Sequence, residues 1–191
     1  MSEAPQATVL AGPTSVGKST LSKHIRIHYP QVHFSVSATT RPSRPGEVDG
    51  EDYHFIDRER FDQLIAEDAF LEWATVHGIH RYGTLQSTVE QAVAEGKRVL
   101  LEIDLQGARQ VRDRLPGAQF VFLAPPSFDD LVSRLIGRGT EDEGERQRRL
   151  RTARIELAAE PEFDVTIVND DIDRAARELI SLMGLDPETY A

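Results

Sequence analysis

The chain contains no cysteine, which excludes a disulfide framework and any metal site built on thiolates. It also lacks an apolar run of about 18 residues, the length that a membrane-spanning helix needs. Its first residues have neither the basic nor the apolar region of a signal peptide, so we expect a cytoplasmic protein. The 6 histidines show no metal-ligand spacing, and we expect none of them to hold a metal.

Basic charge is scarce and unevenly placed. The chain has 22 lysines and arginines against 32 acidic residues, a net charge of −10, which argues against non-specific nucleic-acid binding. Lysine is especially rare, so Lys18 stands out. Arginines cluster late in the chain, at Arg134, Arg138, Arg146, Arg148, Arg149, Arg151 and Arg154. Two interpretations stay open for this cluster: a solvated helix face interleaved with glutamate, or recognition of a polyphosphate by a few planar guanidinium groups.

The hydrophobic pattern predicts one domain in which strands and helices alternate. Strands are predicted at 8–11, 33–39, 71–76, 82–84, 99–103, 120–123 and 165–168. Helices are predicted at 18–27, 57–65, 88–94, 106–115, 127–136, 141–159 and 172–183, with Asp57 and Ser127 as N-caps. This order predicts an α/β fold, an open and mostly parallel sheet with helices on both faces. Residues 35–85 break the rhythm and are predicted to be an inserted subdomain.

A phosphate-binding loop follows the first predicted strand and opens the first helix. Glycine, four residues and Gly-Lys-Ser form the P-loop pattern at Gly12, Pro13, Thr14, Ser15, Val16, Gly17, Lys18 and Ser19. Glycine lets the backbone approach phosphate closely, and the helix N-terminus adds its positive dipole end. We expect Lys18 to bridge the β- and γ-phosphates of a nucleotide and the Ser19 hydroxyl to bind Mg²⁺.

Further motifs occur in a fixed order along the chain. They read SVSATTRPSRPGE at 35–47, GEDYHF at 50–55, FLEWA at 70–74, YGT at 82–84, EIDLQG at 102–107, APPS at 124–127, GRGTE at 137–141 and IVND at 167–170. With the P-loop, this series resembles the guanylate kinase family over residues 8–183. The combination is far more specific than any one motif, since a P-loop alone does not choose among families.

The resemblance implies a P-loop kinase fold and the reaction ATP + GMP → ADP + GDP with Mg²⁺. It divides the chain into a core (1–36, 86–137 and 153–191), a GMP-binding subdomain (37–85) and a lid (138–152). ATP and GMP are the expected partners, with dGMP left open, and we expect no nucleic acid, membrane or obligatory protein partner.

The same resemblance assigns the site residues. For GMP it implies Ser37, Arg41, Arg44, Tyr53, Glu72, Tyr82, Thr84 and Asp104. For ATP it implies Gly12, Pro13, Thr14, Ser15, Val16, Gly17, Lys18, Ser19, Thr20, Arg134, Arg138 and Asn169, with Ser19 on the metal. The catalytic set is Lys18, Arg41, Arg134, Arg138 and Arg149. Glu102 is expected near Mg²⁺-bound water or beside an arginine.

Chemistry supports the guanine assignment, because guanine offers a ring N–H and an adjacent amine, for which carboxylates are the best acceptors. Adenine would leave Glu72 and Asp104 unpaired. The sequence also departs from the family at two places: Ser15 stands where glycine is usual, and residues 77–82 are one residue longer, with Arg81 replacing a usual tyrosine. Arg81 is therefore an alternative to Tyr82 for the GMP phosphate. Two other functions stay open: a kinase for another small phosphorylated acceptor, and a non-catalytic guanylate-kinase-like binding module.

Overall fold

A computed structural model describes residues 5–76, 78–136 and 143–188 of the chain. Its strands are β1 (Ala7–Ala11), β2 (Val32–Phe34), β3 (Ala38–Thr39), β4 (His54–Phe55), β5 (Phe70–Val76), β6 (His80–Leu85), β7 (Arg98–Glu102), β8 (Gln119–Ala124) and β9 (Val165–Val168). Its helices are α1 (Lys18–His28), α2 (Arg58–Ala66), α3 (Gln86–Ala94), α4 (Leu105–Arg114), α5 (Phe128–Ile136), α6 (Glu143–Leu157) and α7 (Ile172–Leu182), with a 3-10 turn at Glu160–Glu162.

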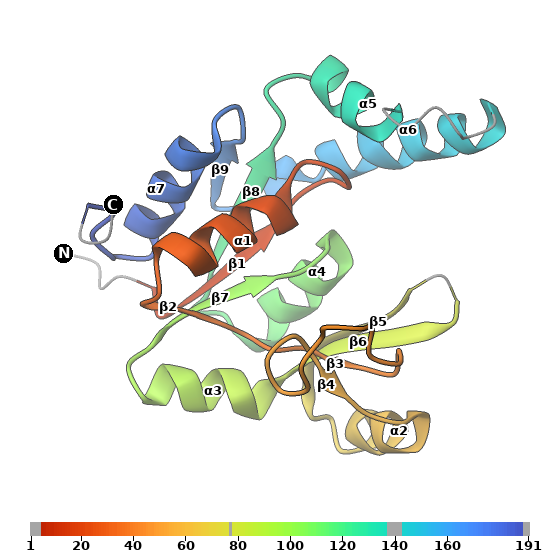
Figure 1. The fold of residues 1–191 in the computed structure, drawn as a ribbon, viewed down its shortest axis with the longest axis vertical. Coiled ribbons are helices and arrows are strands. Elements are labelled where there is room, and N and C mark those ends of the chain that lie inside the picture. The colour runs from red at the N-terminus through yellow and green to blue at the C-terminus, as the bar shows by residue number, and fades with distance from the viewer. Residues whose placement is uncertain (1–4, 77, 137–142, 189–191) are drawn as a thin grey trace.

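The core is a five-stranded parallel sheet in the order β2-β7-β1-β8-β9 (Figure 1). The first strand, β1, is central, where Val9 pairs with Leu101 on one side and Phe120 on the other. Alternate residues of β1 point to opposite faces: Leu10 joins one buried cluster, while Val9 joins the other. Because both faces are covered, the strands are almost continuously apolar, as the sequence predicted.

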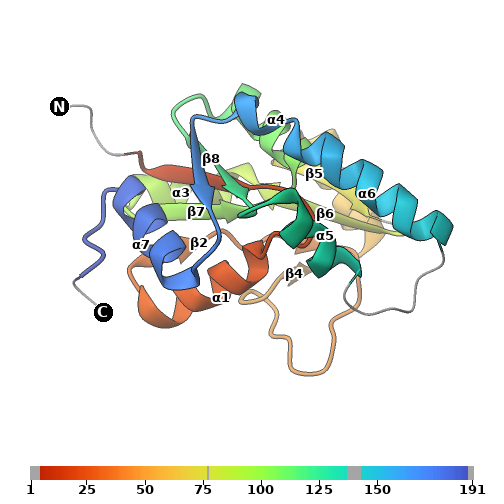
Figure 2. The ribbon, with the colours of Figure 1, turned by 90° about the horizontal axis from the view of Figure 1, so that it is seen from above.

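Helices cover the two faces of this sheet in two groups. Leu21 of α1 and Leu179 of α7 pack with the cluster on one face. Val89 of α3 and Val111 of α4 pack with the cluster on the other. Figure 2 shows α1 and α7 on the opposite side of β1 and β8 from α4. The predicted α/β class is thereby confirmed.

A second sheet accounts for the break in the strand–helix alternation. Its four strands have the order β4-β3-β6-β5 and lie with α2 beside the core sheet (Figure 1). Phe61 of α2 stacks on Phe70 of β5 with ring centroids 4.6 Å apart. The Gln110 amide of α4 donates to the Trp73 carbonyl and accepts from the Trp73 N–H, both at 3.1 Å. These bonds tie the edge strand β5 to the core.

One strand prediction is wrong. Residues 33–39 do not form a single strand, because β2 ends at Phe34 in the core sheet and β3 starts at Ala38 in the second sheet. The last core contact of this segment is the Ser35 N–H, which donates to Leu100 O at 3.1 Å. Alternation along the chain reports local burial but cannot tell which sheet buries a residue.

The predicted N-caps are confirmed. The Asp57 carboxylate accepts from the Arg60 N–H at 2.7 Å, and the Ser127 hydroxyl accepts from the Asp130 N–H at 3.1 Å. In the described ranges, no helix combines the length and apolarity needed to cross a membrane.

Candidate active site

The loop between β1 and α1 has the backbone that its glycines permit. A Cβ at Gly12 would lie 2.4 Å from the carbonyl oxygen of Leu123, so a side chain cannot fit between β1 and β8. Gly17 has φ +105° and caps α1, where a Cβ would lie 2.6 Å from Nδ2 of Asn169. Ser15 also has a left-handed φ, +66°, a conformation that glycine adopts more readily than serine. The loop thus turns tightly into a helix N-terminus, as an anion site requires.

Lys18 folds back over this loop. Its ammonium donates to the carbonyl oxygens of Gly12 at 2.6 Å and Pro13 at 3.1 Å. Burial lowers the pKa of Lys18 below its usual value, while the charge of Glu156 opposes that effect. The cation therefore stands at the mouth of the loop, where it can meet phosphate oxygens.

The next residue, Ser19, supplies a candidate metal ligand. Its hydroxyl donates to Oε1 of Glu102, at the end of β7, over 2.9 Å. A serine hydroxyl and a carboxylate are the hard oxygen ligands that Mg²⁺ takes. These residues fit a magnesium ion carried on nucleotide phosphates, with Glu102 close enough to bind a metal-bound water.

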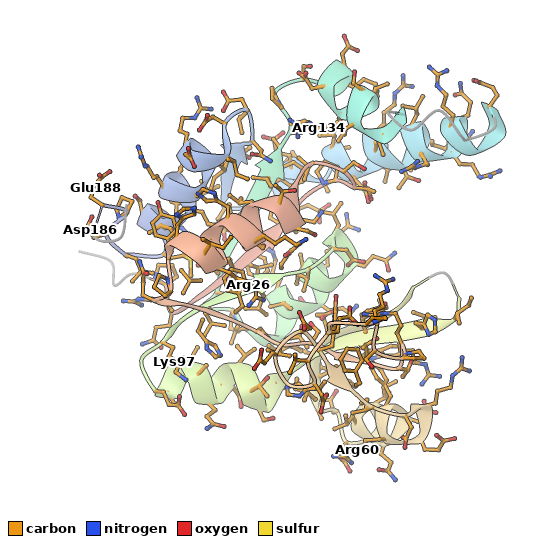
Figure 3. All side chains as sticks on the ribbon, in the orientation of Figure 1. Arg26, Arg60, Lys97, Arg134, Asp186 and Glu188 are labelled. Carbon is orange, nitrogen blue, oxygen red and sulfur yellow. The ribbon has the colours of Figure 1, made fainter. Side chains whose placement is uncertain are left out.

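Arg134 and Asn169 hold the far side of the loop. Arg134 Nη1 and Asn169 Nδ2 each donate to the Val16 carbonyl at 2.9 Å. Figure 3 shows Arg134 between α5 and the start of α1. Both side chains line an open cleft of about 390 Å³ with Gly17 and Thr20. Arg134 and Asn169, both predicted for ATP, thus lie together beside the loop.

The two remaining predicted arginines fall in the segment that the sequence predicts to be a lid, residues 138–152. Arg138 lies in 137–142, outside the described residues. Arg149 is half-buried on α6, seven residues before Glu156, and thus on the same helix face about 10 Å further along the axis. Glu156 itself contacts the P-loop residue Thr14 at 2.8 Å. Arg149 therefore lies on the same side of α6 as Glu156, the residue that contacts the P-loop.

Four of the residues predicted for the GMP phosphate lie on the second sheet and its loops. Arg41 is 8% exposed, and its guanidinium forms a bidentate ion pair with Glu47 at 2.7 and 3.0 Å. This hydrogen-bonded pair raises the pKa of Arg41 above its usual range. The rings of Tyr53 and Tyr82 meet edge to face at 5.8 Å, and the Arg41 guanidinium lies 5.4 Å from the Tyr53 ring. Arg44 is exposed, and its backbone N–H donates to Glu47 at 2.6 Å.

The residues predicted to read guanine also meet. Glu72 is 7% exposed and accepts from the Thr84 hydroxyl at 2.7 Å. Burial raises the pKa of Glu72 to about 7, and the nearby Asp104 carboxylate adds to that effect. A Cβ at Gly107 would lie 3.0 Å from Oε2 of Glu72 and 3.4 Å from Oδ1 of Asp104, so both carboxylates converge on one point. Asp104 additionally caps α4 by accepting from the Gly107 N–H at 2.7 Å.

One cleft is lined by residues from both the P-loop side and the second sheet. It has a volume of about 460 Å³ and lies between α1 and the loop that ends at Tyr53. Ser19 and Glu102 line it from the P-loop side, and Ser37 and Tyr53 line it from the second sheet. A phosphoryl donor bound at the P-loop and a phosphoryl acceptor bound at the second sheet would therefore face each other across this cleft.

Arg81 points elsewhere in this structure. Its guanidinium pairs with Asp62 of α2 and lies 5.9 Å from the Phe61 ring. Tyr82, in contrast, lies against Tyr53 and beside Arg41. Tyr82, unlike Arg81, therefore lies together with Arg41 and Tyr53.

Three residues near the site received no role from the sequence. Glu47 lay in a quoted motif, six residues after Arg41 in a Pro/Gly loop, where its pairing could have been suspected. Gly107 also lay in a motif, but its closeness to Glu72 depends on how β5 meets α4. Glu156 gave no local signal, since its partner Thr14 is 142 residues away.

A parallel α/β core with a phosphate loop, which shares a cleft with a second small sheet, is typical of P-loop kinases for small phosphorylated molecules. The sequence model of one family, described as Guanylate kinase, matches residues 4–184. The chain belongs to the guanylate kinase family.

Individual relatives agree with this assignment. The chain is 58% identical over 179 residues to a guanylate kinase of Leifsonia xyli subsp. xyli, covering 94% of this chain and 70% of that protein. It is 57% identical over 177 residues to a guanylate kinase of Thermobifida fusca, covering 93% and 90%. The crystal structure of guanylate kinase from Anaplasma phagocytophilum superposes with a TM-score of 0.70 at 30% identity, covering 96% of this chain and 87% of that one.

Proposed function

We propose that this enzyme transfers the γ-phosphoryl group of Mg·ATP to GMP, producing ADP and GDP. The observation that carries the proposal is the buried Glu72 carboxylate, which converges with Asp104 at Gly107, while the charge of Asp104 also acts on Lys18 of the P-loop. A buried carboxylate of this kind needs hydrogen-bond donors, and the adjacent N–H groups of guanine supply them.

Guanine selection follows from the cost of leaving these acceptors unpaired. Glu72 and Asp104 accept from the ring N–H and the exocyclic amine, while Thr84 orients the Glu72 carboxylate. Ser37 lies near the guanine carbonyl oxygen. Adenine lacks these two neighbouring donors, and a site built for such donors rejects the wrong base by roughly 10⁴–10⁵-fold.

The GMP phosphate is held by Arg41, Arg44, Tyr53 and Tyr82. Arg41 is already oriented by Glu47, so binding phosphate costs little side-chain entropy. A GMP phosphate oxygen is an anionic nucleophile, so no general base is needed. It forms the new bond to the γ-phosphorus while the bond from that phosphorus to the β-phosphate oxygen breaks, and ADP leaves.

On the donor side, the backbone of residues 12–20 surrounds the phosphates and Lys18 bridges the β- and γ-phosphates. Ser19 would hold Mg²⁺, with Glu102 on its water. The metal, when bound, neutralises charge on the transferring phosphoryl group. Asn169 and Arg134 border the cleft that we assign to the adenosine end of ATP.

Arg134, Arg138 and Arg149 complete the catalytic set by neutralising transition-state charge, since phosphoryl transfer depends on positioning and electrostatics. The proposal includes the division into a core (1–36, 86–137 and 153–191), a GMP-binding subdomain (37–85) and a lid (138–152). Closure of the last two over the core excludes water from the reacting phosphate.

The proposal also places the enzyme in the cytoplasm with ATP and GMP as partners. The net charge of −10 supports the absence of a nucleic-acid partner. Intact Lys18 and Ser19 favour the enzyme over the binding module.

A coupled ADP-release assay tests the function, with Mg·ATP and GMP, AMP, CMP or UMP offered in parallel. We expect turnover with GMP that Lys18→Ala abolishes, because the ammonium at the P-loop is lost. Lys97→Ala is the matched control, since Lys97 pairs with Glu95 on the surface after α3. Equal or better turnover with another acceptor would refute the guanine assignment, and tight GMP binding without turnover would favour the binding module.

A further inference from the structure

A carboxylate from α6 is bound to the P-loop. Oε2 of Glu156 accepts from the backbone N–H of Thr14 at 2.8 Å, and Oε1 accepts from the Thr14 hydroxyl at 3.2 Å. Glu156 is half-buried and lies in the last turn of α6, the helix that also carries the proposed lid arginine Arg149. One carboxylate therefore fixes both the backbone and the side chain of a single loop residue.

The loop needs such an anchor at this position. Ser15, the next residue, has φ +66°, a conformation that side-chain-bearing residues adopt only when the surroundings enforce it. Pro13, the preceding residue, has no backbone N–H to donate. The turn is closed locally by the Val16 N–H, which donates to Pro13 O at a long 3.3 Å.

The two ends of the turn are held by different elements. Val16 O accepts from Arg134 of α5 and from Asn169 after β9, each at 2.9 Å. Thr14 is held by Glu156 of α6. Between these two anchors lies Ser15, whose conformation sets the direction of the following amides. The charge of Glu156 also favours the ammonium form of Lys18.

We propose that Glu156 is a positioning residue for the nucleotide phosphates: by holding Thr14 it keeps Ser15 left-handed and the loop amides convergent. It also links α6, which carries Arg149, to the loop that binds ATP. The proposal rests on the proposed use of this loop for ATP. The opposing hypothesis is that the Glu156 carboxylate competes with phosphate for the loop.

The experiment measures ATP and ADP binding by calorimetry in the absence of GMP, on Glu156→Ala, Glu156→Gln, Ser15→Gly and the double variant E156A/S15G. Glutamine keeps an acceptor for the Thr14 N–H but removes the charge, and glycine removes the conformational cost at residue 15. Glu178→Ala, an exposed carboxylate on α7, is the matched control. Thermal unfolding reports whether each variant is folded.

We expect Glu156→Ala to weaken both nucleotides about tenfold, Glu156→Gln to stay within about threefold of the parent, and E156A/S15G to recover most of the loss. In turnover, KM for ATP should rise in Glu156→Ala while KM for GMP changes less than about twofold. If Glu156→Ala does not fold, Thr14→Val removes the hydroxyl contact alone and should weaken nucleotides about threefold.

Unchanged nucleotide affinity in Glu156→Ala, or in Thr14→Val where that variant is the one available, would overturn the proposal. Tighter binding by Glu156→Gln would also overturn it, in favour of competition with phosphate. The wild-type enzyme separates the two failures: absence of GMP turnover refutes the proposed reaction, whereas the nucleotide titrations need no acceptor and test Glu156 alone.

Discussion

The Thr84 hydroxyl donates a 2.7 Å hydrogen bond to the buried Glu72 carboxylate across neighbouring strands β6 and β5. This bond favours the ionised carboxylate, but burial dominates and raises the pKa of Glu72 to about 7. The group proposed to read guanine therefore titrates near neutral pH, which has consequences for both activity and stability.

We expect kcat/KM for GMP to fall as the pH drops below about 7. Protonation turns one oxygen of Glu72 into a hydrogen-bond donor and so removes acceptor capacity that guanine needs, and in the free enzyme Glu72 becomes protonated in that range. Steady-state kinetics from pH 5.5 to 8.5, a range of about three units around that pKa, would measure this. The value of kcat/KM for GMP should decrease toward acidic pH, whereas kcat at saturating GMP should not. Glu72→Gln is the control, because GMP's own phosphate titrates equally with both enzymes. A decrease of the same size in Glu72→Gln would contradict the assignment.

The same shift predicts an unusual stability profile. The pKa of Glu72 is 4.5 in the unfolded reference and about 7 when folded, so the folded state holds the proton more tightly. This group's contribution to stability is present below about pH 4.5 and is lost as the pH rises through 7. Glu72→Gln should therefore raise the free energy of unfolding at pH 8, by at most about 3 kcal/mol, and by less at pH 5.5.

Urea unfolding of both proteins at the two pH values measures this difference. A gain for Glu72→Gln that is no larger at pH 8 than at pH 5.5 would show that the folded-state pKa of Glu72 is not raised. Equal gains at both pH values would attribute the effect to something other than titration.

Gly107→Ala should damage the GMP site without destabilising the protein. The added methyl would lie 3.0 Å from Glu72 Oε2, so the carboxylate must shift. Alanine improves helix propensity in α4 by up to about 1 kcal/mol, which leaves global stability near its original value. We expect KM for GMP to rise at least about tenfold, with KM for ATP within about twofold.

The matched control for that change is Gly117→Ala, since no atom lies within 4 Å of a Cβ at Gly117. It should leave both KM values unchanged. An unaffected KM for GMP in Gly107→Ala would mean that the carboxylates do not meet guanine beside α4.

Arg81 and Tyr82 can be separated by their own substitutions. Arg81 pairs with Asp62, so Arg81→Ala should change KM for GMP by less than about twofold. Tyr82→Phe removes a hydroxyl that interacts with Arg41, and should raise KM for GMP by about fivefold to tenfold. Steady-state kinetics with varied GMP distinguishes them, and the reverse order of effects would assign the phosphate contact to Arg81.

Local patterns predicted most of the fold. The buried strand β1, the amphipathic α1 and the caps Asp57 and Ser127 depend on residues a few positions apart, and the structure confirms them. The single strand predicted at 33–39 was wrong because choosing between two sheets requires their partners, β7 and β6. Asp104 was predicted to bind guanine, but the sequence analysis did not predict that Asp104 is also the N-cap of α4.

By itself, the sequence determined the P-loop, the alternation of strands and helices, and the ordered motifs of the guanylate kinase family, because each depends on spacing along the chain. Only the tertiary structure decided that Glu72 and Asp104 converge at Gly107, that Arg81 turns to Asp62, and that Glu156 holds Thr14. These contacts join residues from 19 to 142 positions apart in the chain. No local propensity encodes such pairs; the packing of α4, α2 and α6 against the two sheets creates them.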